Sequence, residues 1–584
     1  MMDDRRRPTD DRRKLRADQH CASTCGRRSS VVCRLLFLSL CIALAACQPV
    51  RPSQTALLVN DAPAIVAVQP LTPQTECTNA FVAHNLDFAT GNRMHTIAMY
   101  ASNGSGVTAN DLNGDGLIDL AFASIDGPSA ILWNRGQLNF EREELPDVNT
   151  RAALSVDVDG DGLIDVVFTH RASTSAGGVS FWRNTGNSHF EQRPLPGVDA
   201  IAYSIGWADL NGDNTLDLVT GSYNAEFKKE GVEADQYAER SGVFVYEQRS
   251  NGFQPQRLVT DSQSLSIGLL DLNGDGHLDI WAANDFALQD SIWLHTPQAW
   301  QPARPLRQTS HSTMSIDWAD LDNSGQPTLF STDMNPYDTS PENMAAWLPM
   351  MAATDEKRQP DDRQIMANVL LRPDGQGGWR NDAAARGIDA SGWSWAGRFG
   401  DLDQDGYLDA YVVNGMIAKD LFGHLHNDEL VEANRAYRNS RTGRFVLTPE
   451  WQLGSLNSGR GMLMADVDND GDLDIVVNNL RGVAQLFENK LCGGNSLQVD
   501  LNWRGVGNRH AIGATLTLYT SAGVYQRDIR ASGGYLSGDV VRAHFGLPRG
   551  ATLRRLQITW PDGRSSQITA SQLLQPNALL HIQR

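Results

Sequence analysis

Residues 466–474 read Asp466-Val-Asp468-Asn-Asp470-Gly471-Asp-Leu-Asp474, the fullest copy of a DxDxDGxxD pattern that recurs along the chain. Carboxylates this close together repel one another unless a cation lies among them. Oxygen ligands at positions 1, 3, 5 and 9, a backbone carbonyl at position 7 and a glycine at position 6 suit a hard cation held at about 2.3–2.6 Å. The stretch therefore predicts a calcium site.

The flanks of this stretch argue against an EF-hand. Val477 occupies position 12, where an EF-hand loop has a glutamate ligand. Residues 460–465 and 473–477 are mostly apolar and have the pattern of β-strands rather than of helices. We therefore predict a hairpin of two strands whose connecting loop binds a metal ion.

The pattern occurs seven times, at intervals of roughly 45 to 80 residues, and the copies are called loops one to seven. Loop three has Asn214 at position 6, which tolerates the left-handed backbone almost as glycine does. Loop five, residues 320–328, has Ser324 at position 5 and Thr328 at position 9, so we expect it to bind an ion weakly or not at all. The predicted ligands for about six calcium ions are Asp111, Asn113, Asp115 and Asp119; Asp157, Asp159, Asp161 and Asp165; Asp209, Asn211, Asp213 and Asp217; Asp271, Asn273, Asp275 and Asp279; Asp401, Asp403, Asp405 and Asp409; and Asp466, Asp468, Asp470 and Asp474.

Each loop lies between two apolar strands. A third strand follows it and then, except in the last repeat, a fourth strand that begins with Phe or Trp. Four strands per repeat are typical of a propeller blade, and seven repeats predict seven blades. The expected fold is all-β: a seven-bladed β-propeller over residues 77–492, then a small β-sandwich-like domain over residues 493–584. A solenoid built from the same hairpins is the alternative, although its repeats would be shorter and more uniform.

The seventh repeat has no fourth strand of its own. Residues 81–88, upstream of loop one, resemble a fourth strand without a blade, so we predict that they complete blade seven and close the ring. This pairing brings Cys77 next to Cys492, which are the two cysteines downstream of residue 47. We predict a disulfide between them, with two buried thiols as the alternative.

The N-terminus resembles a bacterial lipoprotein signal. An arginine-rich segment over residues 1–30 precedes an apolar run over residues 31–44 and the sequence Leu44-Ala-Ala-Cys47. We predict a signal peptide over residues 1–46, acylation of Cys47 and a flexible tether over residues 47–76. The protein would then be exported and lipid-anchored in the cell envelope, at the outer membrane if the source is Gram-negative, facing the periplasm or the surface. An uncleaved membrane helix and twin-arginine export are the alternatives.

The charge excludes one class of partner. The net charge is −19 overall and near −24 without residues 1–46, so nucleic acid is a poor partner. We expect a monomer that contacts the membrane through its lipid anchor only. The sequence has no GxSxG, HExxH, phosphate-binding-loop or CxxC motif, so we assign no catalytic residue and no organic cofactor.

The loops and their flanks resemble the FG-GAP or VCBS repeats of integrin α-subunit propellers. Further segments narrow the resemblance to the cartilage-acidic-protein-like family, in which an ASPIC/UnbV domain follows the propeller. The resemblance implies an extracellular calcium-binding propeller and does not imply a catalytic activity. The segments that carry it are residues 311–320, 331–334, 392–395 and 458–461 in the propeller, and 507–514, 533–537, 544–547 and 558–563 near the C-terminus.

Three long insertions indicate a surface for a ligand. They follow the second strands of blades three, five and six, at residues 222–241, 334–366 and 415–435. In a meander this position lies on the face opposite the metal loops, and functional residues concentrate on such loops. The leading hypothesis is a calcium-binding lipoprotein that binds a glycan or protein ligand or mediates adhesion through this face. An enzyme acting on extracellular polysaccharide and an envelope scaffold without a ligand are the alternatives.

Overall fold

The computed structural model describes residues 54–58, 61–73, 76–171, 178–229, 238–286, 288–354 and 362–584. All of them belong to one compact unit, Pro52–Arg584. The signal peptide and the acylated Cys47 that the sequence predicts lie outside these residues. In the described part of the chain, no helix combines the length and the apolar character needed to cross a bilayer.

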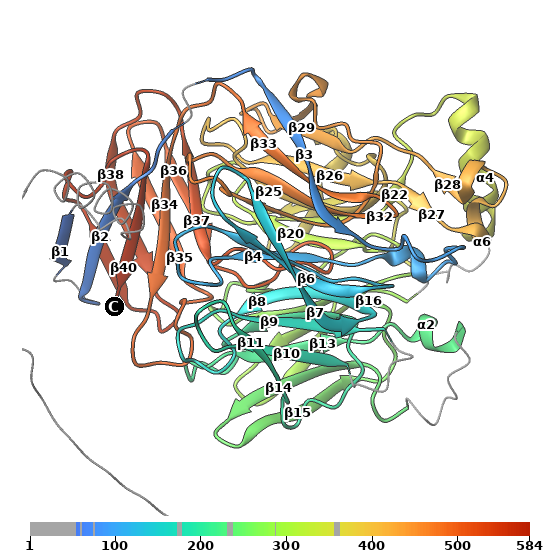
Figure 1. Ribbon diagram of the computed structural model, residues 1–584, viewed down its shortest axis with the longest axis horizontal. Coiled ribbons are helices and arrows are strands. Elements are labelled where there is room, and N and C mark those ends of the chain that lie inside the picture. Colours follow the sequence, from blue (N-terminus) through green and yellow to red (C-terminus); the bar gives the residue numbers. More distant parts are fainter. Residues whose placement is uncertain are drawn as a thin grey trace, which may run out of the picture. The chain divides into compact units, whose positions relative to one another are not determined.

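The strands of the first three blades follow one another along the chain, four antiparallel strands to a sheet (Figure 1). Blade one comprises β4 (Val107–Asn110), β5 (Asp119–Phe122), β6 (Pro128–Asn134) and β7 (Phe140–Val148). Blade two comprises β8 (Thr150–Val156), β9 (Asp165–His170), β10 (Val179–Asn184) and β11 (Phe190–Arg193). Blade three comprises β12 (Ser204–Ala208), β13 (Asp217–Gly221), β14 (Val243–Arg249) and β15 (Gly252–Val259).

The next three blades repeat this order. Blade four comprises β16 (Ser264–Leu270), β17 (Asp279–Asn284), β18 (Ser291–His295) and β19 (Trp300–Ala303). Blade five comprises β20 (Ser315–Ala319), β21 (Thr328–Thr332), β23 (Val369–Pro373) and β24 (Trp379–Asn381). Blade six comprises β25 (Gly392–Gly400), β26 (Asp409–Asn414), β29 (Arg435–Asn439) and β30 (Phe445–Leu447), with β22 (Met334–Asn335) added at its inner edge.

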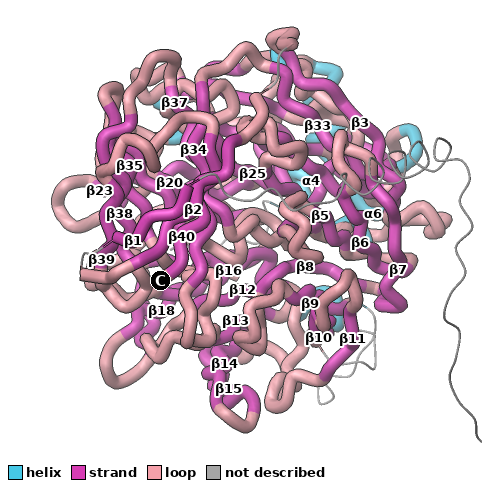
Figure 2. Tube along the Cα trace, turned by 60° about the vertical axis from the view of Figure 1, so that its left-hand side comes forward, coloured by secondary structure: helices cyan, strands magenta, loops and turns pink. Residues whose placement is uncertain are grey.

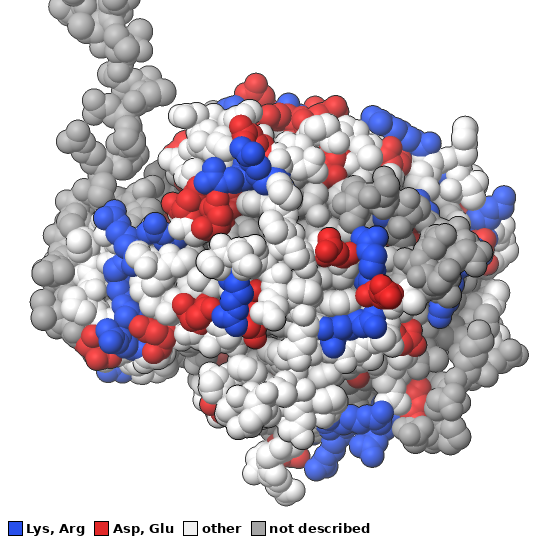
Figure 3. All heavy atoms as spheres, turned by 90° about the horizontal axis from the view of Figure 1, so that it is seen from below, with Lys and Arg blue, Asp and Glu red and all other residues white. Residues whose placement is uncertain are grey.

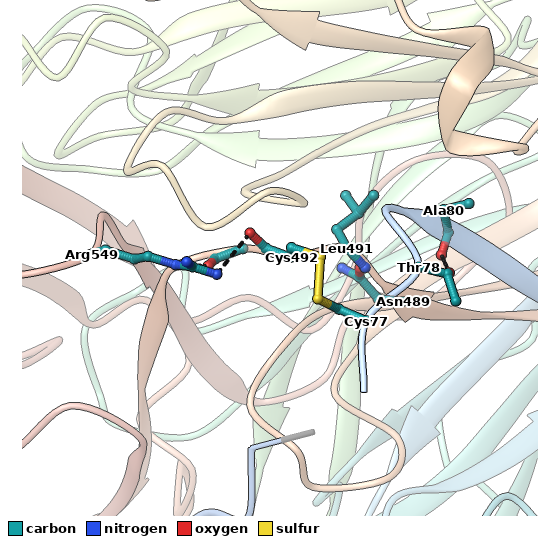
Figure 4. The surroundings of a disulfide bond; sticks show 8 residues. Cys77, Thr78, Ala80, Asn489, Leu491, Cys492 and Arg549 are labelled. Carbon is teal, nitrogen blue, oxygen red and sulfur yellow. Dashed lines mark hydrogen bonds between the residues drawn. A yellow bond between two sulfur atoms is a disulfide. The ribbon is translucent and has the colours of Figure 1, made fainter. Parts of the chain in front are cut away.

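Blade seven closes the ring as the sequence predicts. Its strands are β31 (Ser458–Ala465), β32 (Asp474–Leu480), β33 (Val483–Lys490) and, from the other end of the propeller, β3 (Ala80–Ala89). β3 pairs antiparallel with β33, with Ala80 opposite Lys490. Cys77 and Cys492 form a disulfide beside this pair, with their Cα atoms 5.3 Å apart (Figure 4). The first strands of neighbouring blades contact each other around the ring, and β31 contacts β4.

Burial differs between the inner strands and the outermost strand of a blade. Every residue of β8 and of β9 is buried, because each blade packs between two neighbours. The outermost strand β7, by contrast, exposes most of the polar residues along its length. The blades therefore pack through buried inner strands, which include polar residues such as Arg151, and expose polar side chains at the rim.

The C-terminal domain is a sandwich of two sheets. One sheet has the order β36 (Val524–Asp528), β35 (Thr515–Thr520), β38 (Leu553–Thr559) and β39 (Ser565–Ile568). The other has the order β1 (Gln54–Leu58), β2 (Ala64–Pro70), β40 (Ala578–Gln583), β34 (Asn495–Asn502) and β37 (Arg542–Leu547). Buried side chains of both sheets, among them Val499 and Leu556, belong to one apolar cluster.

The prediction of a flexible tether over residues 47–76 is wrong for residues 54–58 and 64–70. β2 pairs along its length with β40, as Figure 2 shows, and β1 pairs with β2. The alternation in β2 of buried Ala64, Val66 and Val68 with more exposed residues is the pattern of a strand that covers a core. This segment is therefore part of the C-terminal domain, which combines both ends of the described chain.

The metal loops and the insertions lie on opposite faces of the propeller. Each loop joins the first strand of a blade to its second, and each insertion joins the second strand to the third. The insertions contain α2 (Asn224–Lys229), α4 (Pro341–Thr354) and α6 (Lys419–Phe422), and also β27 (Met416–Ile417), η3 (His426–Asp428) and β28 (Glu429–Leu430). In Figure 1 these helices lie on the right and the C-terminal strands on the left. We call the two sides the insertion face and the loop face.

Candidate functional site: the metal loops and the plugged channel

The position-1 carboxylate organises each loop. In loop one, Asp111 Oδ1 accepts the N–H groups of Gly114 (2.8 Å) and Asp115 (3.1 Å), and Oδ2 accepts that of Gly116 (2.9 Å). Loops two, three and four repeat all three bonds, and loops six and seven repeat the bonds from positions 5 and 6. Position 6 has a left-handed backbone, with φ of 88° at Gly116 and 67° at Asn214.

The position-9 carboxylate ties each loop to the third strand of its blade. Asp119 Oδ2 accepts the N–H of Leu112 (3.1 Å), and Oδ1 accepts the N–H of Asn134 (2.8 Å) at the end of β6. The five other predicted metal loops make the same two bonds. The spacing within the loops does not predict this third-strand residue. The recurrence of Asn at that place in blades one, two, six and seven was a visible signal.

Three loops gather carboxylates closely enough to hold a metal ion. In loops two, six and seven, ligand atoms from positions 1, 3 and 9 lie within 4.8 Å of one another. Asp403 Oδ1 in loop six and Asp470 Oδ2 in loop seven are buried and accept no hydrogen bond from the described residues. Loops one, three and four have Asn at position 3 and so present fewer carboxylates. The donor set fits a hard cation, since buried oxygens without donors need a positive partner.

Burial makes these clusters costly without a cation. Burial, together with the neighbouring carboxylates of each loop, raises the pKa of Asp165 and of Asp401 to about 8 and that of Asp466 to about 7. An ion among the carboxylates would counter both causes. The electrostatics of the clusters therefore favour a bound cation over a set of protonated acids.

Loop five keeps the turn but has a different charge balance. Asp320 accepts the N–H groups of Ser324 (2.8 Å) and Gly325 (2.7 Å), as position 1 does elsewhere. Asp322, however, forms ion pairs with two arginines. Its Oδ2 lies 2.6 Å from Arg372 Nη2, and its two carboxylate oxygens accept hydrogen bonds from Arg386 Nη2 (2.8 and 2.9 Å). Arg386 belongs to α5 (Ala383–Arg386), 64 residues away. Two guanidinium groups thus oppose the two carboxylates of this loop.

The C-terminal domain covers much of the loop face. Asn508 donates its N–H to Asn214 O (2.8 Å), Arg509 Nε donates to Gly160 O (3.0 Å), and His544 Nε2 lies 2.9 Å from Gly471 O. Gln498 Nε2 donates to Asp466 Oδ2, a predicted ligand of loop seven. Backbone atoms of loops two, three and seven therefore form part of the docking surface, a contact that the sequence pattern does not predict.

Residues 530–541 of the C-terminal domain plug the central channel from the loop face. Gly534 donates its N–H to Ile316 O in β20 (2.9 Å), and Leu536 O accepts the N–H of Ala153 in β8 (3.0 Å). These two strands belong to blades five and two, on different sides of the ring. Tyr535, at the end of the plug, is fully buried and donates its hydroxyl to Asn103 O (2.9 Å).

Four charged residues fasten this plug. Arg530 pairs with Asp317 (2.9 Å) and Asp539 (3.3 Å), and Arg398 pairs with Asp539 and lies 3.7 Å from Asp317. Two of these residues come from the propeller and two from the C-terminal domain. A cavity of about 520 Å³ lies beside them between the two domains. Its lining includes Gln326 from the propeller and Asp528 from the C-terminal domain.

The channel is also filled from the insertion face. Arg151 in β8 and Glu226 in α2 form an ion pair with no solvent exposure. Asp333, just before the insertion of blade five, accepts the N–H groups of His311 (2.7 Å), Ser312 (3.0 Å) and Met334 (2.6 Å) and is buried. Asp333 therefore holds the backbone in place rather than facing a ligand.

Comparisons with known proteins support the assignment of both parts. Residues 157–220, 271–331 and 419–477 match the FG-GAP-like repeat, and residues 505–584 match ASPIC and UnbV. The chain carries FG-GAP-like repeats and an ASPIC/UnbV domain. The FG-GAP-like segments include loops two, three, four, five and seven, and the ASPIC/UnbV domain contributes the plug.

Cartilage acidic protein 1 is similar to part of this chain. The mouse protein is 31% identical over 209 residues, which are 32% of this chain and 31% of the mouse protein. The human protein is 29% identical over 187 residues, which are 29% of this chain and 28% of the human protein. The match thus spans about a third of the length of these relatives.

Two solved propellers resemble the fold. The BBS1N chain of its complex with ARL6DN has 11% identity and a TM-score of 0.38, and covers 70% of this chain and 98% of its own length. The Pan2 WD40 domain of Neurospora crassa has 9% identity and the same TM-score, with 71% and 98% covered. Neither likeness, at this score, bears on function.

Proposed function

We propose that this protein is a calcium-binding, extracytoplasmic protein without catalytic activity that binds a glycan or protein ligand through its insertion face. The insertion face is chosen because the ASPIC/UnbV domain covers loops two, three and seven on the opposite face and plugs the channel from there. The insertion face keeps three long loops on a rigid ring, the usual arrangement of a recognition surface.

Calcium is the ion that the loops fit best. The ligands are oxygens at positions 1, 3, 5 and 9, and six loops hold two of their carboxylates by backbone N–H groups. Equilibrium dialysis of the mature chain should count about six bound calcium ions. A chain that binds none at millimolar calcium would contradict this part of the proposal.

The ligand surface can be tested with two matched variants. Leu348 in α4 is 55% exposed on the insertion face, and Val524 in β36 is 42% exposed on the C-terminal domain. A glycan array and a pull-down from envelope extracts should yield a ligand whose binding Leu348→Asp weakens and Val524→Asp leaves unchanged. Equal loss in both variants would contradict the proposed face.

The two other functions are distinct outcomes of the same screen. Turnover of a captured polysaccharide would indicate an enzyme. Absence of any ligand from both screens would indicate a scaffold. Either outcome replaces the proposal of a binding protein.

We also propose that Cys47 carries a lipid that anchors the protein in the envelope. The support is the sequence Leu44-Ala-Ala-Cys47 after an apolar run. Cys47→Ser should release the protein in soluble form during fractionation. Protein that stays with the membrane after this change would contradict the lipid anchor.

A further inference from the structure

The register of the blades places one equivalent third-strand residue near every metal loop. The residue after position 9 pairs with a third-strand residue, such as Leu120 with Leu132 in blade one or Val166 with Trp182 in blade two. The next residue on the third strand defines what we call the counter-charge position. From the register of all seven blades, it is Trp133, Arg183, Glu247, Leu294, Arg372, Arg438 and Glu488 in blades one to seven.

The charge at this position follows the residue at position 3 of the loop. Loops two, five and six have Asp at position 3, and their counter-charge positions hold Arg183, Arg372 and Arg438. Loops one, three and four have Asn at position 3 and no base at the counter-charge position. Loop seven departs from this rule, since it has Asp at position 3 and Glu488 at the counter-charge position. Its Lys490, two residues further along the strand and paired with Glu488, has a counterpart in Arg249 of loop three, which pairs with Glu247.

Two of the bases at the counter-charge position, Arg183 and Arg372, contact the position-3 carboxylate of their loop. Arg183 Nε donates to Asp159 Oδ2 at position 3 of loop two, and its Nη2 donates to Asp161 Oδ2 at position 5 (2.6 Å). In loop six the contact comes instead from Arg441, beyond the end of β29, whose Nε donates to Asp405 Oδ2 at position 5 (2.7 Å). Across the face drawn in Figure 3, basic and acidic side chains likewise lie beside one another. A guanidinium group at these oxygens offsets about one unit of the loop's negative charge.

We propose that the third-strand base is a built-in counter-cation that sets the calcium affinity of its loop. This inference rests on the proposed calcium binding. The base offsets the additional carboxylate at position 3, so that loop two, with four carboxylates and Arg183, has the same net charge as loop one with three. Loop five is the limiting case, because two arginines offset its two carboxylates and leave no net charge to attract an ion.

Removal of the base should tighten calcium binding at that loop alone. Arg183 and Asp159 are each about one-third exposed, so the competition is screened and the expected gain in affinity of loop two is about 2- to 10-fold. Arg183→Lys retains the charge and should bind as the unaltered chain does. Arg135→Gln is the matched control, because Arg135 pairs with Glu141 (2.8 Å) rather than with a ligand of loop one.

The experiment is a calcium titration of the mature chain against a fluorescent chelator. Asp157→Asn, which alters a ligand, identifies the binding phase of loop two by its loss. The expected result is a shift of that phase to tighter binding in Arg183→Gln, with no shift in Arg183→Lys or Arg135→Gln. Unfolding midpoints in saturating calcium verify that each variant is folded.

Three results would overturn the inference. Unchanged or weaker binding by loop two in Arg183→Gln refutes the counter-cation while leaving the proposed calcium binding intact. An equal shift in Arg135→Gln shows a general effect of surface charge and refutes the local role of Arg183. A chain that binds no calcium refutes the proposed function itself, and the inference with it.

Discussion

The two faces of the propeller both bury carboxylates, but they do so in different ways. On the loop face, loop seven places Asp466, Asp468 and Asp474 within 4.8 Å of one another. On the insertion face, Asp333 accepts three backbone N–H groups, and Glu432 accepts the N–H of Trp393 (2.6 Å). A single buried acid is satisfied by hydrogen bonds, whereas a cluster of acids needs a cation.

The removal of calcium tests this comparison most strongly. A chelator should destabilise the loop face, because an ion that binds only the folded chain contributes about 2.7 kcal/mol per site at a hundred times its Kd. Six sites make this the largest expected effect, visible in urea unfolding with and without calcium. An identical unfolding midpoint in both conditions would mean that the loops are solvated turns.

The disulfide also belongs to the loop face, since Cys492 follows the end of β33. Replacement of both Cys77 and Cys492 by Ala should lower the free energy of unfolding by about 2–5 kcal/mol, because the bond closes a long loop of the unfolded chain. The measurement is urea unfolding in saturating calcium. The control is the unaltered protein under reducing conditions, which should match the variant. A variant as stable as the oxidised protein would show that strand pairing alone closes the ring.

A substitution on the insertion face should separate stability from metal binding. Asp333→Ala removes the acceptor of three buried N–H groups and should cost about 3 kcal/mol of unfolding free energy. It should leave the number of bound calcium ions unchanged, whereas Asp466→Asn should weaken one site. Calcium stoichiometry and urea unfolding of both variants provide the comparison. Loss of calcium from Asp333→Ala would remove the distinction between the faces.

The smallest effect concerns pH. Burial raises the pKa of Glu432 from 4.5 to about 7, so the folded chain holds this proton more tightly than the unfolded chain does. Its contribution to stability is complete below about pH 4.5 and is lost as the pH rises towards 7, by about 2 kcal/mol between pH 5 and pH 7. Glu432→Gln in saturating calcium should flatten this part of the stability profile. An unchanged profile would show that Glu432 is ionised in the folded protein throughout.

The sequence by itself determined the local part of this molecule. The ligands of each metal loop lie within nine consecutive residues, so their spacing alone predicts the turn, the left-handed Asn214 and the cluster of carboxylates. Strand counting predicted the blades, the closure by β3 and the pairing of Cys77 with Cys492. These features can be predicted because the same short-range pattern occurs in seven repeats. Calcium occupancy and the lipid on Cys47 stay predictions.

Only the tertiary structure decided how distant segments meet. β2 joins the sheet of β40, Arg386 reaches Asp322 in loop five, and Tyr535 enters the channel to reach Asn103 O. These partners lie 64 to more than 500 residues apart, and no periodicity links them. Such contacts depend on which surfaces remain to be buried once the ring has closed, and that is a property of the assembled fold and not of any stretch of sequence.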